Sequence, residues 1–220
     1  MENFNIALDG PSGSGKSTVA KALSQKLGIL YLDTGAMYRA VAVKALRLGV
    51  APLDECAVNG VLSELDLDIR YQDGAQHTYL DGEDVSQTIR EPQVSMAASD
   101  ISSLKCVRLK MVEMQRLIAS KMSCVLDGRD IGSYVLPQAK YKFFVTADVA
   151  VRAKRRFLEL QDKGFSVDYD FIYREIEQRD HNDRTRSFAP LVKAEDAIEI
   201  DTSVLSVEEV VSKILSYIGV

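Results

Sequence analysis

The chain has 220 residues, 46% of them hydrophobic, which is enough to bury one substantial core, and we expect a single domain with insertions. Its 27 Lys and Arg residues against 32 Asp and Glu residues give a formal net charge of −5. This balance argues against a general nucleic-acid-binding protein, which needs a basic surface. It still allows a small anionic substrate, because a few arginines suffice locally.

Short apolar segments alternate with amphipathic helical patterns along most of the chain. Strands are predicted near residues 5–8, 29–32, 124–126, 142–146 and 197–200. Helices are predicted near residues 17–27, 36–48, 148–162 and 206–218. Alternation of this kind is typical of a parallel sheet, because a helix carries the chain back to begin the next strand in the same direction. The pattern therefore predicts an α/β fold with a doubly wound parallel sheet flanked by helices.

Residues 64–90 break this alternation. Leu65-Asp-Leu-Asp-Ile69 alternates apolar and polar residues, and Thr78-Tyr-Leu80 runs into Asp81-Gly82, a strong hairpin turn. The pattern predicts a small antiparallel sheet inserted into the α/β core, followed by helices near 91–100 and 103–120. Such an insert could fold over the substrate, or it could be a surface excursion without a role.

The run Gly10-Pro-Ser-Gly-Ser-Gly-Lys16-Ser17 follows the first predicted strand and opens the first predicted helix. Its glycines let backbone N–H groups close around phosphate oxygens, and the helix N-terminus adds free donors and partial positive charge. Lys16 can then reach the β- and γ-phosphates, and the Ser17 hydroxyl can ligate Mg²⁺. An ordinary glycine-rich turn is the alternative. All four fixed positions of the motif are matched between a strand and a helix, which predicts binding of a nucleoside triphosphate.

A second polar motif, Asp33-Thr-Gly-Ala-Met-Tyr38-Arg39, follows the second predicted strand, at the sheet edge where open α/β folds bind ligands. We expect Thr34 to cap the next helix, with Arg39 one turn in and within reach of a second phosphate. A plain helix cap beside a solvated arginine is the alternative.

A third motif, Asp127-Gly-Arg-Asp130, follows the apolar run ending at Leu126. An aspartate that ends a buried strand beside a phosphate loop commonly supports the water shell of Mg²⁺, and Arg129 offers a planar fork for phosphate. The alternative is an Asp-Gly turn.

Arginines also gather near the C-terminus. If Arg179-Asp-His-Asn-Asp-Arg-Thr-Arg186 is helical, then Arg179, Asp183 and Arg186 share one face. Mobile arginines that close over a transferring phosphoryl group are typical of phosphotransferase lids. A solvated, salt-bridged helix explains the same mixed charges. Three further arginines on the preceding helix could contribute, or could form a plain basic face: Arg152, Arg155 and Arg156.

Phosphoryl transfer requires positioning and neutralisation of charge rather than a nucleophilic side chain. A phosphate acceptor is itself largely deprotonated, with a second pKa near 6, so it needs no strong general base. Two sets of phosphate-binding groups, one on the triphosphate and one around Arg39 and Arg129, therefore indicate an acceptor that is a phosphate ester.

The whole chain resembles the bacterial cytidylate kinases, of the P-loop nucleoside monophosphate kinase family. The resemblance rests on the motifs 9–17, 32–39, 126–130, 161–166 and 179–186 in this order, with Ala189-Pro-Leu191 and an insert after the second strand. It implies a core with five parallel strands at about 1–60, 101–150 and 187–220. It also implies a monophosphate-binding insert at about 61–100 and a short helical lid within 151–186.

The resemblance implies transfer from Mg²⁺-ATP to CMP or dCMP and a role for each matched residue. ATP would bind to Gly10, Pro11, Ser12, Gly13, Ser14, Gly15, Lys16, Ser17 and Thr18. Mg²⁺ would sit on Ser17 with Asp33 or Asp127 through water. The monophosphate would bind Arg39 and Arg129, with Thr34 and Tyr38 lining its pocket. Ser99, Arg108 and Asp130 would read the cytosine edge, and Arg179 and Asp183 would hold the ribose. The catalytic residues would be Lys16, Asp127, Arg184 and Arg186, of which Arg184 and Arg186 would close on the transferring phosphate. Thr34 stands where many members carry Ser, and the hydroxyl is kept.

Two other classes remain open on the sequence. A kinase for another small acceptor would use the same phosphate loop, although Arg39 and Arg129 disfavour a hydroxyl acceptor. A GTP-binding switch would need a guanine-reading Asn-Lys-x-Asp segment, and none is present. No signal-like apolar N-terminus and no run of membrane-spanning length occur, so we expect a cytoplasmic protein. We expect a monomer that has neither a nucleic-acid nor a membrane partner.

Overall fold

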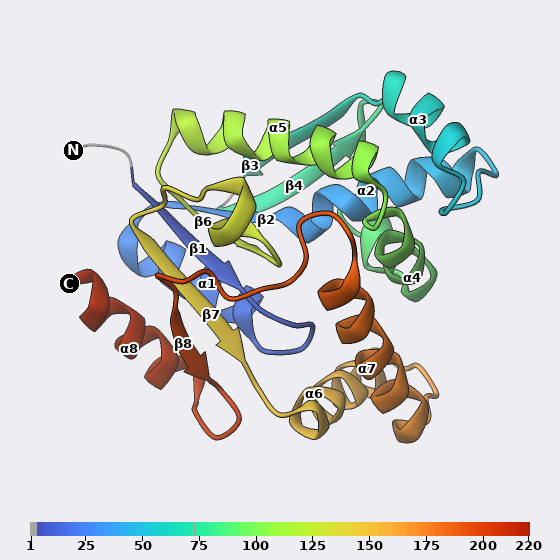
Figure 1. The fold of residues 1–220 in the computed structure, drawn as a ribbon. Helices are drawn as coiled ribbons and strands as arrows, with labels where there is room; N and C mark the ends of the chain where they lie inside the picture. Colours follow the sequence, from blue (N-terminus) through green and yellow to red (C-terminus); the bar gives the residue numbers. More distant parts are fainter. Residues whose placement is uncertain (1–3, 73) are drawn as a thin grey trace. The chain divides into compact units, whose positions relative to one another are not determined.

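The computed structural model describes residues 4–72 and 74–220 (Figure 1). They form two compact units, the first comprising the chain up to Leu30 together with Met122–Val220, and the second comprising Tyr31–Lys121. Within the described ranges, no helix combines the length and the apolar character needed to cross a membrane. The division into core, insert and lid stays a prediction.

A five-stranded parallel sheet has the strand order β2-β6-β1-β7-β8. Its strands are β1 (Asn5–Asp9), β2 (Leu30–Asp33), β6 (Cys124–Gly128), β7 (Tyr141–Thr146) and β8 (Ile198–Asp201). The central strand β1 pairs in parallel with β6 on one side and β7 on the other. Its residues 6–8 are completely buried. A continuous apolar strand of this kind is typical of a sheet covered on both faces, and the predicted fold class is confirmed.

The helices of the first unit begin and end at recognisable signals. They are α1 (Lys16–Leu27), α6 (Val149–Asp162), α7 (Tyr169–Thr185) and α8 (Val207–Ile218), with a π-helical turn at Ile131–Val135. Gly28, at φ 64°, closes α1, and Ser206 with Glu209 forms a capping box at the start of α8. Helices α6 and α7 lie side by side (Figure 1). Between them lies an apolar cluster of Ala153, Leu160, Ile172 and Ile176.

The second unit holds the predicted small antiparallel sheet, in the order β3-β4-β5. Its elements are α2 (Thr34–Arg47), α3 (Glu55–Ser63), β3 (Leu67–Gln72), β4 (Ala75–Leu80), β5 (Glu83–Asp84), a 3₁₀ turn (Thr88–Arg90), α4 (Pro92–Ile101) and α5 (Lys105–Lys121). Asp81 and Gly82 form the two-residue turn between β4 and β5, and both have positive φ, at 51° and 82°. This is the hairpin geometry that Asp-Gly favours. Helix α3 was not predicted, although Asp54 caps it by accepting from the Ala57 nitrogen at 3.0 Å.

The prediction that Thr34 caps helix α2 is wrong, because Asp33 does so. Asp33 has an extended backbone (φ −74°, ψ 94°), and its Oδ1 accepts from the Ala36 nitrogen at 2.9 Å. Thr34 is already the first helical residue. A carboxylate one position earlier satisfies the same free N–H group, so the helix starts one residue sooner than a threonine cap would allow.

Candidate functional site

The loop after β1 has the backbone of a phosphate-binding loop. Gly10, Gly13 and Gly15 all have positive φ, at 152°, 76° and 85°. A Cβ on Gly10 would lie 1.9 Å from the carbonyl oxygen of Val145, so no side chain fits at this position. Helix α1 begins without a side-chain cap, and Ser17 and Thr18 in its first turn are exposed. The N–H groups of this turn are therefore available to an anion.

Lys16 is buried at the start of α1. Its Nζ donates to the carbonyl oxygen of Pro11 at 2.9 Å, across the loop. Burial, together with the positive charges of Arg129 and Arg179, lowers the pKa of Lys16 to about 7, against the opposing charges of Asp127 and Asp183. A lysine held this way gains its full charge when polyphosphate supplies the compensating negative charge.

Ser17 and Asp127 form a pair of oxygen ligands of the kind that Mg²⁺ prefers. The Ser17 hydroxyl donates a hydrogen bond to Oδ2 of Asp127, which is 4% exposed at the end of β6. A hydroxyl and a carboxylate in contact, beside the phosphate loop, fit a Mg²⁺ held mainly by nucleotide phosphates. Of the two carboxylates predicted for this role, Asp127 is the one that contacts Ser17, and its part in holding Mg²⁺ stays a prediction. The oxygens of Asp33 are already engaged within the second unit, as described below.

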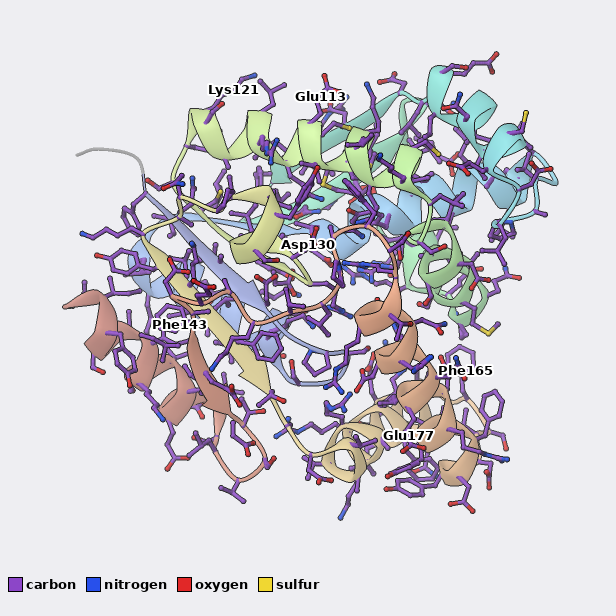
Figure 2. All side chains as sticks on the ribbon, viewed as in Figure 1. Glu113, Lys121, Asp130, Phe143, Phe165 and Glu177 are labelled. Atoms are coloured by element: carbon purple, nitrogen blue, oxygen red, sulfur yellow. The ribbon has the colours of Figure 1, made fainter. Side chains whose placement is uncertain are left out.

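A buried network of charges joins the loop after β6 to the end of α7. The Arg129 Nε donates to Oδ2 of Asp183 at 2.9 Å. The Arg186 guanidinium lies 3.6 Å from Asp183 and 3.7 Å from Asp130, which lies in the loop that follows β6 (Figure 2). Burial disfavours the ionised form of Asp183, but Arg129, Arg179 and Arg186 outweigh it and hold the pKa below its ordinary value. Two carboxylates and three guanidiniums thus lie within one unit.

The predicted shared helical face of Arg179, Asp183 and Arg186 is only partly right. Helix α7 ends at Thr185, and Arg186 follows it with an extended backbone (φ −59°, ψ 139°). Its side chain still reaches Asp183, at 3.6 Å, and its Nε donates to the carbonyl oxygen of Ala189 at 2.7 Å. Arg184, in the last turn, is exposed.

In the second unit, Asp33 organises two arginines. Its Oδ2 accepts from Arg39 at 2.9 Å and from Arg90 at 3.0 Å. Burial would raise its pKa, but Arg39 and Arg90 lower it below the ordinary value. The Asp33 backbone nitrogen also donates a hydrogen bond to Oε1 of Gln76, at 2.8 Å. The predicted phosphate ligand Arg39 is therefore oriented by a carboxylate whose pKa lies below its ordinary value.

The predicted base-reading residues of the second unit lie near one another. Arg108 is 2% exposed, and its guanidinium carbon lies 5.4 Å from the centre of the Tyr38 ring. Its Nη1 donates to the Ser102 carbonyl at 3.3 Å, and the Ser102 hydroxyl donates to the Ser99 carbonyl at 2.8 Å. A buried arginine over an aromatic ring offers planar donors for recognition. Thr34, in the same helix as Tyr38, is also buried.

Sequence reasoning assigned no role to three charged residues whose side chains form specific contacts in the structure: Asp9 with the Gly132 nitrogen, Arg90 with Asp33, and Asp180 with Arg152. Asp9 had a usable signal, because a carboxylate directly after the apolar run Ile6-Ala-Leu8 is unusual in a buried strand. Arg90 had none, since it meets Asp33 across 57 positions. Arg152, considered as part of a basic helix face, is in fact buried and bonded to Asp180.

The chain is similar to known proteins over nearly its whole length. A family model described as cytidylate kinase matches residues 6–219. The chain is 52% identical over 215 residues to a cytidylate kinase of Caldicellulosiruptor bescii, covering 98% of this chain and 95% of that protein. It is 47% identical over 218 residues to a cytidylate kinase of Halalkalibacterium halodurans, covering 99% and 98%.

Among solved structures, an uncharacterized protein from Eubacterium ventriosum superposes with a TM-score of 0.56 at 18% identity, covering 99% of both chains. That likeness concerns the fold. Because the family model spans nearly all of the chain and relatives about half identical cover it almost completely, the chain belongs to the cytidylate kinase family.

Proposed function

We propose that this chain is a kinase that transfers the γ-phosphoryl group of ATP to CMP, and to dCMP, yielding the diphosphate. The observation that carries the choice of acceptor is membership of the cytidylate kinase family, at up to 52% identity over 98% of the chain. The phosphate loop with its buried Lys16 supports the choice of donor independently. An oxygen of the CMP phosphate forms the new bond to the γ-phosphorus, and the bond to the β-phosphate oxygen breaks, releasing ADP.

The donor is held by residues 10–18. Backbone N–H groups of the loop bind the triphosphate, and Lys16 spans its β- and γ-phosphates. Mg²⁺ on Ser17, supported by Asp127, would neutralise charge on the phosphate oxygens. In the free protein, burial disfavours the protonated form of Lys16. Bound triphosphate favours that form, so Lys16 takes up a proton on binding and places its positive charge beside the transferring group.

The acceptor phosphate is bound by arginines. In the second unit, Arg39 is the phosphate ligand, oriented by Asp33, with Thr34 and Tyr38 beside it. In the first unit, Arg129 is a second phosphate ligand and Arg184 and Arg186 act on the transferring group. Arg179 and Asp183 bind the ribose. The acceptor oxygen is already ionised at neutral pH, so these side chains need to position it and balance its charge, and no general base is required.

The base is read by one acceptor and two donors. The Asp130 carboxylate accepts from the exocyclic amine of cytosine, and Arg108 and Ser99 donate to the ring acceptors. Uracil presents an acceptor in place of that amine, which would leave the carboxylate of Asp130 unpaired. Cytosine is therefore favoured over uracil.

A coupled turnover assay with Mg²⁺-ATP against CMP, dCMP, UMP, AMP and GMP tests the proposal. We expect CMP and dCMP to be phosphorylated well above the other three. Equal or better use of UMP or AMP would keep phosphoryl transfer but reject the acceptor, and the absence of acceptor-dependent turnover would reject the kinase. The proposal includes a monomer acting in the cytoplasm with these nucleotides as its partners, and sedimentation analysis with and without CMP tests the monomer.

A further inference from the structure

Arg152, on α6, donates hydrogen bonds to three different residues and is not among the nucleotide ligands proposed above. Its side chain is 2% exposed. Its Nε donates to the carbonyl oxygen of Ala147 at 2.9 Å, and its Nη1 donates to that of Ser12 at 3.1 Å. The guanidinium also donates two hydrogen bonds to the Asp180 carboxylate, at 3.1 and 2.6 Å. A planar fork with fixed donors joins these groups in one geometry.

One end of this contact is the phosphate loop itself. Ser12 lies inside the loop, and the next residue packs directly on Arg152. A Cβ on Gly13 would lie 3.1 Å from the Arg152 Cβ and 3.3 Å from its carbonyl oxygen. The contacts of Ser12 and Gly13 with Arg152 therefore hold the loop beside α6.

The other end is helix α7. Asp180 is 5% exposed and follows Arg179 directly. One turn later, Asp183 accepts from Arg129 and meets Arg186 at 3.6 Å. The Arg152–Asp180 pair thus connects the phosphate loop with the helix that carries the arginine-rich segment.

Stability alone does not explain this pair. Helices α6 and α7 already pack through their own apolar cluster of Ala153, Leu160, Ile172 and Ile176. A buried ion pair commonly stabilises a fold no more than apolar side chains of similar volume, because two charges must leave water. An apolar pair would not hold the two helices in one orientation, because dispersion contacts, unlike hydrogen bonds, do not fix the angle between the groups that touch.

We propose that Arg152 is a positioning residue for phosphoryl transfer, which aligns the phosphate loop with Arg184 and Arg186, at and just after the end of α7, through Ser12 and Asp180. The inference rests on the proposed function, because it assigns those arginines to the transferring phosphate. It predicts that losing the pair slows the chemical step more than it weakens nucleotide binding. Misplacement of reacting groups by about 1 Å can lower a rate on the order of 100-fold.

The test compares two variants with a matched control. The double variant Arg152→Met/Asp180→Leu replaces the pair by apolar groups, and Arg152→Lys keeps the charge but removes the fork. Arg156→Met is the control, because Arg156 lies one turn along α6 and pairs at its surface with Glu159 at 3.0 Å. For each protein we would measure thermal unfolding, the Kd of ATP, and kcat and KM for CMP.

We expect the double variant to unfold near the wild-type temperature and to bind ATP within about threefold of wild type, with kcat lowered about 10- to 100-fold. Arg152→Lys should show the same split, and it decides the question if the double variant does not fold. Arg156→Met should match wild type. A folded double variant or Arg152→Lys protein with near-wild-type kcat would show that the pair is only structural.

The wild-type measurement separates the two proposals. If wild type phosphorylates another acceptor instead of CMP, the proposed acceptor is wrong, and the same comparison with that acceptor still decides the role of Arg152.

Discussion

The carboxylate of Asp9 and the backbone nitrogen of Gly132 lie 2.7 Å apart, although 123 positions separate them in the sequence. The Ile131 nitrogen donates to the same carboxylate, also at 2.7 Å. The Asp9 carboxylate thus accepts from the first two N–H groups of the π-helical turn at Ile131–Val135 and fixes the start of that turn, directly after Arg129 and Asp130. Burial raises the pKa of Asp9 to about 7, with Asp130 adding to the rise and the two N–H groups and Lys16 opposing it.

The raised pKa of Asp9 predicts a fall in stability between about pH 4 and pH 7. The folded protein holds this proton up to about pH 7, whereas the unfolded chain releases it near 3.8, so the folded state binds more protons in between. The free energy of unfolding therefore decreases as pH rises through this window, by a few kcal/mol at about 1.4 kcal/mol per pKa unit. Denaturant unfolding across a pH series measures the slope.

Asp9→Asn is the control for this slope, because an amide does not titrate. We expect the variant to be nearly flat between pH 4 and pH 7. Asp33 and Asp183 have lowered pKa values, so their opposite contribution appears at lower pH, where they gain protons. A slope that survives unchanged in Asp9→Asn would assign the pH dependence to other groups.

The lowered pKa of Lys16 predicts that the protein takes up a proton when it binds ATP at pH 8. With its pKa lowered to about 7 by burial and by Arg129 and Arg179, Lys16 is mostly neutral at that pH in the free protein. Bound triphosphate favours the ammonium form, so uptake should approach one proton at pH 8 and be small at pH 6. Calorimetry in two buffers of different ionisation enthalpy measures it. Lys16→Met should abolish the uptake, and an equal uptake in that variant would contradict the assignment.

Gly10→Ala should destabilise the protein much more than Gly28→Ala. A Cβ at position 10 would meet the Val145 carbonyl at 1.9 Å, so backbone of the central sheet must move. At position 28, where φ is 64°, no atom lies within 4 Å, and the substitution carries only the strain of a left-handed residue, about 1–2 kcal/mol. Thermal unfolding compares the two variants directly. Similar losses would show that the loop adapts.

Asp130→Asn should lower the preference for CMP over UMP about tenfold or more, because an amide can donate to uracil where the carboxylate cannot. The informative quantity is the ratio of kcat/KM for the two nucleotides. Asp130 also lies 3.7 Å from Arg186, and disturbing that contact should slow both substrates alike. The exposed Asp162→Asn serves as control. An unchanged ratio would remove Asp130 from base recognition.

Local patterns predicted most of the regular elements and missed those whose signals were ambiguous. Apolar runs placed the five strands to within about two residues, because a buried parallel strand must be apolar on both faces. Asp33 and Thr34 are both good helix caps, and only the backbone angles at Asp33 decide between them. The Arg179–Arg186 segment carried a helical spacing, yet the helix ends at Thr185. The turn at Ile131–Val135 had no local signal, because the carboxylate that accepts from its first N–H groups belongs to Asp9, in β1.

Residue types at short, fixed spacings were enough to predict the fold class, the phosphate loop and the family. The tertiary structure decided which charges meet. Asp33 could have paired with many cations, but it meets Arg39 and Arg90, and Asp180 meets Arg152 rather than a neighbour on its own helix. An ion pair requires only that two side chains come within a few ångströms in a buried place. That proximity follows from how whole helices and strands pack, and no spacing along the chain encodes it.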